Sequence, residues 1–127
     1  MKTILLDTSF LVACAEFRID YEQEINRIVD ENYSLAIIDR TIDELDMLIE
    51  KGGKAAKNAK LAKAILARKK ITLIQTSGSR HVDKLILETA KPESHLVATI
   101  DAALKQKLKQ KGIGLIVVRQ KKYLAVE

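Results

Sequence analysis

The residues best suited to chemistry are four carboxylates, each in a separate segment of the chain: Asp7, Glu44, Asp83 and Asp101. Four carboxylates at close range repel one another and resist ionisation. Mg²⁺ or Mn²⁺ relieves that repulsion, because such ions prefer oxygen ligands, keep several waters and take one or two carboxylates directly. A bound ion of this kind activates water and stabilises charge on a phosphodiester. If the fold gathers the four acids, they predict metal-assisted hydrolysis.

Two of these acids stand where strands are expected to end. Asp7 comes directly after the first predicted strand, and Asp101 comes directly after the fourth. Ligands of open parallel sheets bind at the carboxyl ends of the strands, where the strand order reverses. We therefore expect Asp7 and Asp101 to meet if their strands are neighbours. Glu44 and Asp83 fall in the first turns of predicted helices, which begin near the same edge.

The elements that must position the acids follow from the hydrophobic pattern. Continuous apolar runs predict buried strands at residues 4–6, 35–38, 71–74, 96–100 and 113–118. Helical spacing of apolar residues predicts helices at residues 8–15, 21–31, 41–50, 54–68, 82–90 and 102–111, and Ser77-Gly78-Ser79 is a predicted loop. Apolar strands alternating with amphipathic helices indicate a parallel sheet covered on both faces. We expect one domain, residues 1–127, with a three-layer α/β/α fold around a mainly parallel sheet.

Other kinds of chemistry are poorly represented in the chain. Cys14 is the single cysteine, so an internal disulfide is excluded, and its apolar neighbours indicate a buried position. His81 and His95 are too far apart for a local metal motif, and there is no nucleophile elbow or glycine-rich phosphate loop. The N-terminus imitates a signal peptide, but Asp7 interrupts its apolar stretch. No run approaches the roughly 20 apolar residues that span a bilayer, so we expect a cytoplasmic protein without a membrane segment.

Charge is separated along the chain, which has a net charge of +5. Residues 51–70 hold eight Lys or Arg and no acid, and residues 102–126 hold seven and no acid. Such clusters favour a polyanionic partner such as RNA, although a solvated lysine-rich surface fits them equally well. No aromatic residue is near the lysine-rich segment in sequence, so we expect phosphate contacts rather than base stacking. The candidate RNA-backbone contacts are Lys54, Lys57, Lys84 and Arg119.

The four acids occur within motifs that resemble those of the PIN-domain nucleases. These motifs are Asp7-Thr8-Ser9, Asp43-Glu44-Leu45, Val82-Asp83 with Ala90 seven residues later, and Thr99-Ile100-Asp101. The resemblance implies that Asp7, Glu44, Asp83 and Asp101 hold Mg²⁺ or Mn²⁺, with supporting hydrogen bonds from Thr8, Ser9 and Thr99. It further implies an endoribonuclease that uses metal-activated water, and frequent homodimers. The lysine-rich segment after Asp43-Glu44-Leu45 and the ending at residues 117–123 look most similar to archaeal members that resemble the nucleases of small-subunit ribosomal RNA processing.

Two departures and several alternatives remain open. Lys84 stands where related chains often carry a second acid, and Ile100 stands where many carry Asn. The Lys84 ammonium group suits a substrate phosphate, would weaken a second metal position, or simply lies on an exposed helix surface. Asp43 is an adjacent rival to Glu44. The toxins of toxin–antitoxin pairs share the same acids, and such a toxin would have an antitoxin partner. A non-catalytic RNA-binding scaffold is the alternative from another class. A receiver domain is disfavoured, because the acid pair that it needs near its first strand is missing.

Overall fold

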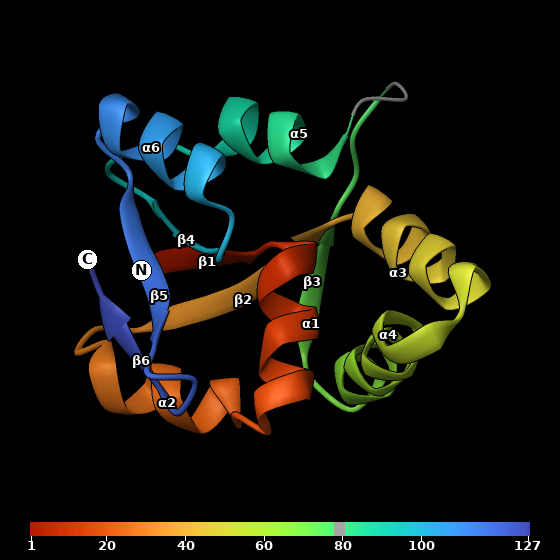
Figure 1. The fold of residues 1–127 in the computed structure, drawn as a ribbon. Coiled ribbons are helices and arrows are strands. Elements are labelled where there is room, and N and C mark those ends of the chain that lie inside the picture. The colour runs from red at the N-terminus through yellow and green to blue at the C-terminus, as the bar shows by residue number, and fades with distance from the viewer. Residues whose placement is uncertain (78–80) are drawn as a thin grey trace.

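The computed structural model describes residues 1–77 and 81–127, so most of the predicted loop 77–79 lies outside the described residues. Within these ranges the chain forms a six-stranded sheet of order β3-β2-β1-β4-β5-β6 (Figure 1). Its strands are β1 (Lys2–Leu6), β2 (Tyr33–Ile38), β3 (Ile71–Ile74), β4 (His95–Ala98), β5 (Gly114–Arg119) and β6 (Tyr123–Val126). All neighbouring strands are parallel except β5 and β6. The predicted α/β class with a mainly parallel sheet is confirmed.

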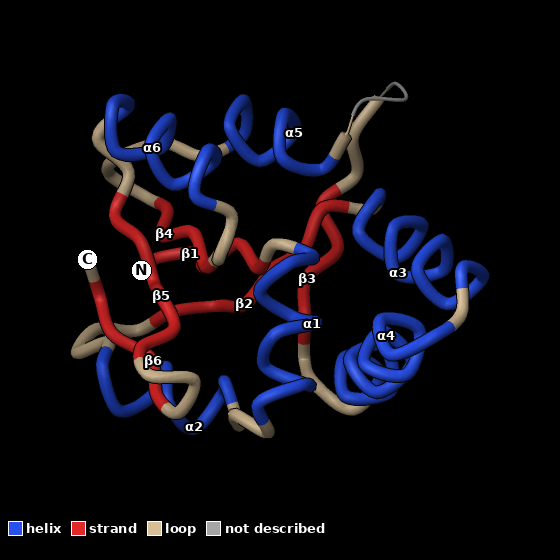
Figure 2. The backbone as a smooth tube through the Cα atoms, viewed as in Figure 1, coloured by secondary structure: helices blue, strands red, loops and turns tan. Residues whose placement is uncertain are grey.

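Helices cover both faces of this sheet, as the tube in Figure 2 shows. They are α1 (Thr8–Phe17), α2 (Tyr21–Ile28), α3 (Arg40–Lys51), α4 (Gly53–Ala67), α5 (Val82–Thr89) and α6 (Ala102–Lys111). Side chains of β1 alternate between two cores: Ile4 and Leu6 pack with α1 to α4, whereas Leu5 packs with α5 and α6. The three layers that the sequence predicts are therefore present. Among the described residues, no helix combines the length and the apolar character needed to cross a membrane.

The order of the strands reverses between β1 and β4. After β1 the chain adds β2 and β3 on one side, and then returns to place β4 against the other side of β1. Leu6 pairs in register with Ala98, and the Asp7 amide donates to the Ala98 carbonyl over 2.9 Å. The expectation that the strands before Asp7 and Asp101 are neighbours is confirmed. Their carboxyl ends form the crevice in which an open sheet binds its ligand.

Strand β6 is the element that the sequence did not predict. It forms a hairpin with β5 through Gln120 and Lys121, which both have positive φ angles, 54° and 55°. Hairpin turns of this kind usually carry Asn-Gly or Asp-Gly, so Gln-Lys gives little signal. Several predicted boundaries also differ from the structure: for example, the helix at 21–31 ends at Ile28, and the strand at 96–100 spans His95–Ala98.

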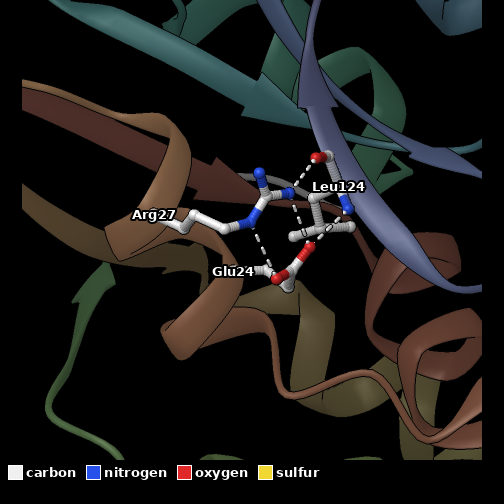
Figure 3. A network of polar contacts seen from close by, with 3 residues as sticks. All are labelled: Glu24, Arg27 and Leu124. Atoms are coloured by element: carbon white, nitrogen blue, oxygen red, sulfur yellow. Dashed lines mark hydrogen bonds and ion pairs between the residues drawn. The ribbon is translucent and has the colours of Figure 1, made fainter.

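The outer edge of β6 is covered at Leu124 by two side chains from α2. Arg27 Nη2 donates to the Leu124 carbonyl (3.1 Å), and the Leu124 amide donates to Glu24 Oε1 (3.0 Å), as Figure 3 shows. Arg27 also donates to both oxygens of Glu24. The exposed edge of a sheet is a template for pairing with another chain. The Glu24–Arg27 pair occupies that edge at Leu124 and fixes α2 to the sheet.

Candidate active site

A hollow of about 620 Å³ lies at the crevice between β1 and β4. Its lining includes carboxylates from four separate parts of the fold, namely Asp7, Glu44, Asp83 and Asp101. Three helices begin at this hollow, because residues from the first turns or N-caps of α1, α5 and α6 line it. Helix N-termini carry partial positive charge and favour anions nearby. We call this cavity the acidic hollow.

Asp7 is the most constrained of the four acids. Its side chain is only 5% exposed, and its Oδ2 accepts hydrogen bonds from Ser9 Oγ and Thr99 Oγ1, both 2.7 Å. Burial raises the pKa of Asp7 above its ordinary value; the bonds from Thr99 and Ser9 oppose this rise, and the nearby Glu44 adds to it. Asp7 occupies the N-cap position of α1, but its side chain makes no capping bond. A helix-capping role therefore does not explain this buried carboxylate.

Thr99 connects Asp7 with Asp101. The Thr99 side chain is fully buried, and its hydroxyl donates to Asp7 while accepting from the Asp101 amide over 3.1 Å. Asp101 itself caps α6, because its Oδ1 accepts from the Leu104 amide over 2.9 Å. One carboxylate oxygen of Asp101 thus caps α6, while the residue is exposed to solvent and lines the hollow. A single hydroxyl group fixes the relation between the two strand-end acids.

Glu44 reaches the hollow from the second turn of α3, and not from the first turn as predicted, because the helix begins one residue earlier, at Arg40. Its Oε1 accepts from Thr8 Oγ1 over 2.7 Å, and its Oε2 accepts from the Val82 amide at the start of α5 over 3.4 Å. The rival Asp43 does not line the hollow; it pairs with Arg40 at 3.4 Å, and its side chain is 56% exposed. Only one member of this adjacent pair is therefore placed to act on a ligand.

Helix α5 contributes two opposite charges to the hollow. Asp83 lies in the first turn of α5, is exposed and lines the hollow. Lys84, the next residue, lines the same hollow and is also exposed. Within the described residues, Lys84 is the one Lys or Arg in that lining. Lys84 therefore adds a positive charge to a lining that is otherwise rich in acids.

Several lining residues were not predicted from the sequence. Glu16 adds a fifth carboxylate from the far end of α1, and His81, the N-cap residue of α5, and Ile100 also line the hollow. Glu16 carried no signal, because it follows Asp7 by nine residues and belongs to no motif. It reaches the hollow because α1 turns the same side toward it at Thr8, Val12 and Glu16.

The donor set fits a hard divalent cation. The polar groups that face the hollow are mainly carboxylate and hydroxyl oxygens, the ligands that Mg²⁺ and Mn²⁺ prefer. Among the described residues, no three Asp, Glu, His or Cys side chains converge closely enough to enclose one ion. An ion that takes one or two carboxylates directly and reaches the others through its waters does not need such a cluster.

The predicted RNA-backbone residues fall into three places. Lys84 lines the acidic hollow, whereas Lys54 and Lys57 line a second hollow between α1 and α4. Arg119 lines neither of them, and its Nη2 pairs with Glu127 at 2.8 Å. The structure therefore separates these four cations instead of gathering them into one patch.

The fold and this cavity define an open α/β protein with an acid-lined hollow at the point where strand order reverses. Residues 4–121 match the family described as the PIN like domain, and the chain belongs to this family. Ribonuclease VapC4 of Methanocaldococcus jannaschii is 32% identical over 127 residues, which cover 99% of this chain and 97% of that relative. A ribonuclease is thus among the sequence relatives of this chain.

Solved structures agree with this fold. The PIN domain endonuclease Utp24 is 21% identical and covers 98% of this chain and 90% of its own, with a TM-score of 0.74. VapBC2 from Rickettsia felis, solved with a DNA fragment from its promoter, is 19% identical over 91% of this chain and 98% of its own, with a TM-score of 0.63. At these identities the likeness shows the fold alone, and the fold is that of the predicted family.

Proposed function

We propose that this protein is a divalent-metal-dependent endoribonuclease whose site is formed by Asp7, Glu44, Asp83 and Asp101. The observation that carries the proposal is the buried Asp7 carboxylate, which lines a hollow together with Glu44, Asp83, Asp101 and a fifth acid, Glu16. Burial raises the pKa of Asp7, so a cation would supply the charge compensation that ionised Asp7 lacks. RNA is the proposed substrate, because a relative that matches nearly the whole chain is a ribonuclease.

Mg²⁺ or Mn²⁺ would be held by the four acids, one or two of them directly and the rest through water. When bound, the ion lowers the pKa of a water molecule and stabilises charge on the phosphodiester. Ser9 and Thr99 hold one oxygen of Asp7 in place, which keeps its orientation constant. Thr8 does the same for Glu44. Hydrogen bonds of this kind, made to the ligands of a metal, typically govern its affinity.

The protein surroundings suit an anionic substrate despite the acids. The N-termini of α1, α5 and α6 direct partial positive charge toward the hollow. The Lys84 ammonium group adds a full charge to the lining, and we propose that it contacts a substrate phosphate. Such contacts orient the RNA without reading its sequence.

The decisive experiment is cleavage of end-labelled RNA with Mn²⁺, Mg²⁺ or EDTA, comparing wild type with Asp7→Asn. We expect cleavage that needs a metal and is lost in Asp7→Asn. Asp43→Asn is the matched control, because that acid lies next to Glu44 but outside the hollow. Equal cleavage by wild type and Asp7→Asn would overturn the proposal. RNA binding with no cleavage in either protein would instead identify a scaffold.

The similar proteins also suggest a biological role for this ribonuclease. We propose that the chain acts as a toxin-like ribonuclease with an antitoxin-like protein partner, because its relatives include Ribonuclease VapC4 and the VapBC2 complex. Induced expression in a bacterial host should then arrest growth for wild type and not for Asp7→Asn. Normal growth with an active enzyme would favour ribosomal RNA processing. Sedimentation of the purified chain tests the expected homodimer.

A further inference from the structure

A second hollow, of about 680 Å³, lies where the end of α1 meets α4. Its lining includes cationic side chains from both helices and one aromatic ring: Phe17, Arg18, Lys54 and Lys57. The size is within the range of roughly 300–1,000 Å³ that is usual for small-molecule sites. We call this cavity the basic hollow. Nothing in the proposed cleavage chemistry uses it.

The two hollows meet along α1. Thr8, Val12 and Glu16 recur at helical spacing and line the acidic hollow, and Glu16 lines the basic hollow as well. Asp7 stands at the N-cap of α1 and Arg18 at its C-cap, so the two cavities are at opposite ends of one helix. Figure 1 shows α1 running beside α4 from the carboxyl end of β1. A ligand that leaves the acidic hollow along α1 therefore enters the basic one.

The charges of the basic hollow are available to an anion. Within the described residues, neither Arg18 nor Lys57 forms an ion pair, and both are exposed. Lys54 pairs with Glu16 at 3.2 Å, but its side chain is 80% exposed. The ammonium group of Lys121 lies 5.6 Å from the centre of the Phe17 ring. Phe17 therefore shares its hollow with Arg18, Lys54 and Lys57 and is approached by a further cation, Lys121, that is not part of the lining.

This arrangement changes the expectation drawn from the lysine-rich segment. In sequence no aromatic residue is near Lys54 and Lys57, so base stacking was not expected. In the fold, Phe17 from α1 lines the same hollow as both lysines. Positively charged grooves with an aromatic side chain are typical of sites that bind single-stranded nucleic acid without sequence preference.

We infer that the basic hollow binds the continuing strand of a single-stranded RNA whose scissile phosphate lies in the acidic hollow. This inference rests on the proposed ribonuclease function. Arg18 and Lys57 contact backbone phosphates, and Phe17 provides an apolar wall for a base or ribose. The ten residues of α1 span about 15 Å. At about 3.4 Å per stacked nucleotide, the hollow holds RNA about four nucleotides from the cleavage point.

The first test measures binding without cleavage. Single-stranded RNA is titrated into Asp7→Asn protein at several salt concentrations, with additional Lys57→Ala or Lys60→Ala changes. A variant that makes one phosphate contact fewer should have a slope of log K against log salt that is smaller by about 0.7. We expect this reduction for Lys57→Ala and for Arg18→Ala. Lys60→Ala is the matched control, because Lys60 is an exposed lysine of the same helix that does not line the hollow. Equal slopes for Lys57→Ala and Lys60→Ala would overturn the inference.

The second test measures cleavage of RNA substrates lengthened from the cleavage point in each direction, one nucleotide at a time. In one direction kcat/KM should rise until about four nucleotides have been added and then level off. Lys57→Ala should remove much of this rise, and Lys60→Ala should keep it. A rise that is the same in both variants would overturn the inference while the ribonuclease function stands. Absence of metal-dependent cleavage in wild type would instead overturn the proposed function itself.

Discussion

Two carboxylates of this protein occupy opposite electrostatic situations. Glu24 lies at the sheet edge, receives hydrogen bonds from Arg27 and from the Leu124 amide, and has a pKa held below its ordinary value mainly by the Arg27 bond (Figure 3). Asp7 lies at the carboxyl end of β1, is buried beside Glu44, and has a pKa that burial raises. The first carboxylate is charge-compensated within the fold, and the second is not.

This difference separates a carboxylate that stabilises the fold from one suited to act on a ligand. A paired, hydrogen-bonded acid favours folding in its charged form. A buried acid without a counter-charge costs folding free energy when it ionises, and active sites are where such arrangements gather. We therefore expect changes at the two positions to have opposite effects on stability and unequal effects on activity.

The largest expected effect is on activity at the acidic hollow. Glu44→Gln should lower RNA cleavage by more than roughly 100-fold, the upper end for residues that only orient metal ligands. Asp43→Asn, one residue away and paired with Arg40, should retain activity near wild type. Initial rates at saturating Mn²⁺ measure both. Similar losses in the two variants would mean that the N-terminal part of α3 as a whole, and not the place of Glu44 in the hollow, determines activity.

A smaller loss is expected when the hydrogen bond to Asp7 is removed. Thr99→Val deletes the hydroxyl that donates to Asp7 Oδ2 and keeps the side-chain shape. Cleavage or metal affinity should fall about 10- to 100-fold, as is usual for groups that orient ligands. A Mn²⁺ titration of activity separates weaker binding from slower turnover. Thr3→Val, on β1 but outside the hollow, serves as the control. An unchanged Mn²⁺ dependence and rate in Thr99→Val would contradict the positioning role.

Stability should rise when Asp7 loses its charge. The folded-state pKa of Asp7 is raised, so its contribution to stability is favourable below the unfolded pKa and is lost as pH rises through the folded pKa. In EDTA at neutral pH, Asp7→Asn should therefore be more stable, within the roughly 0.5–2 kcal/mol usual for single stabilising changes. Thermal unfolding measures this, and added Mn²⁺ should raise the Tm of wild type more than that of the variant. A lower Tm for Asp7→Asn in EDTA would contradict the prediction.

The smallest effect is expected at the sheet edge. Glu24→Gln should lower stability at neutral pH by about 0.5–1 kcal/mol, because the ion pair is partly exposed to solvent. The pKa of Glu24 is lowered, so its contribution is present above the unfolded pKa and is lost as pH falls through the folded pKa. Urea unfolding at neutral pH and at about pH 3 measures both proteins. A difference that persists at the lower pH would show that charge is not its source.

Sequence patterns predicted most of the fold and the composition of the candidate site. The runs ending at Leu6 and Ile38 gave buried strands, because continuous apolar residues need cover on both faces of a sheet. Helical spacing located the six helices of the described residues to within a few residues. Strand β6 was missed because Gln120-Lys121 lacks the turn residues that normally mark a hairpin. Hydrophobic periodicity and turn residues are local properties of the sequence. They therefore predict helices, strands and turns without a structure, and an atypical turn leads to a missed element.

By itself, the sequence determined which residues are the candidates for the chemistry: four separated acids, with Asp7 and Asp101 placed near strand ends. Tertiary structure decided how they meet, since the hydroxyl that holds Asp7 comes from Thr99, 92 positions along the chain. Tertiary structure also placed Glu44, and not Asp43, in the acidic hollow. It placed Phe17 in the same hollow as Lys54 and Lys57 of α4. The physical reason is that spacing along the chain sets the face of an element on which a residue lies. Only the packing of those elements determines what that face contacts.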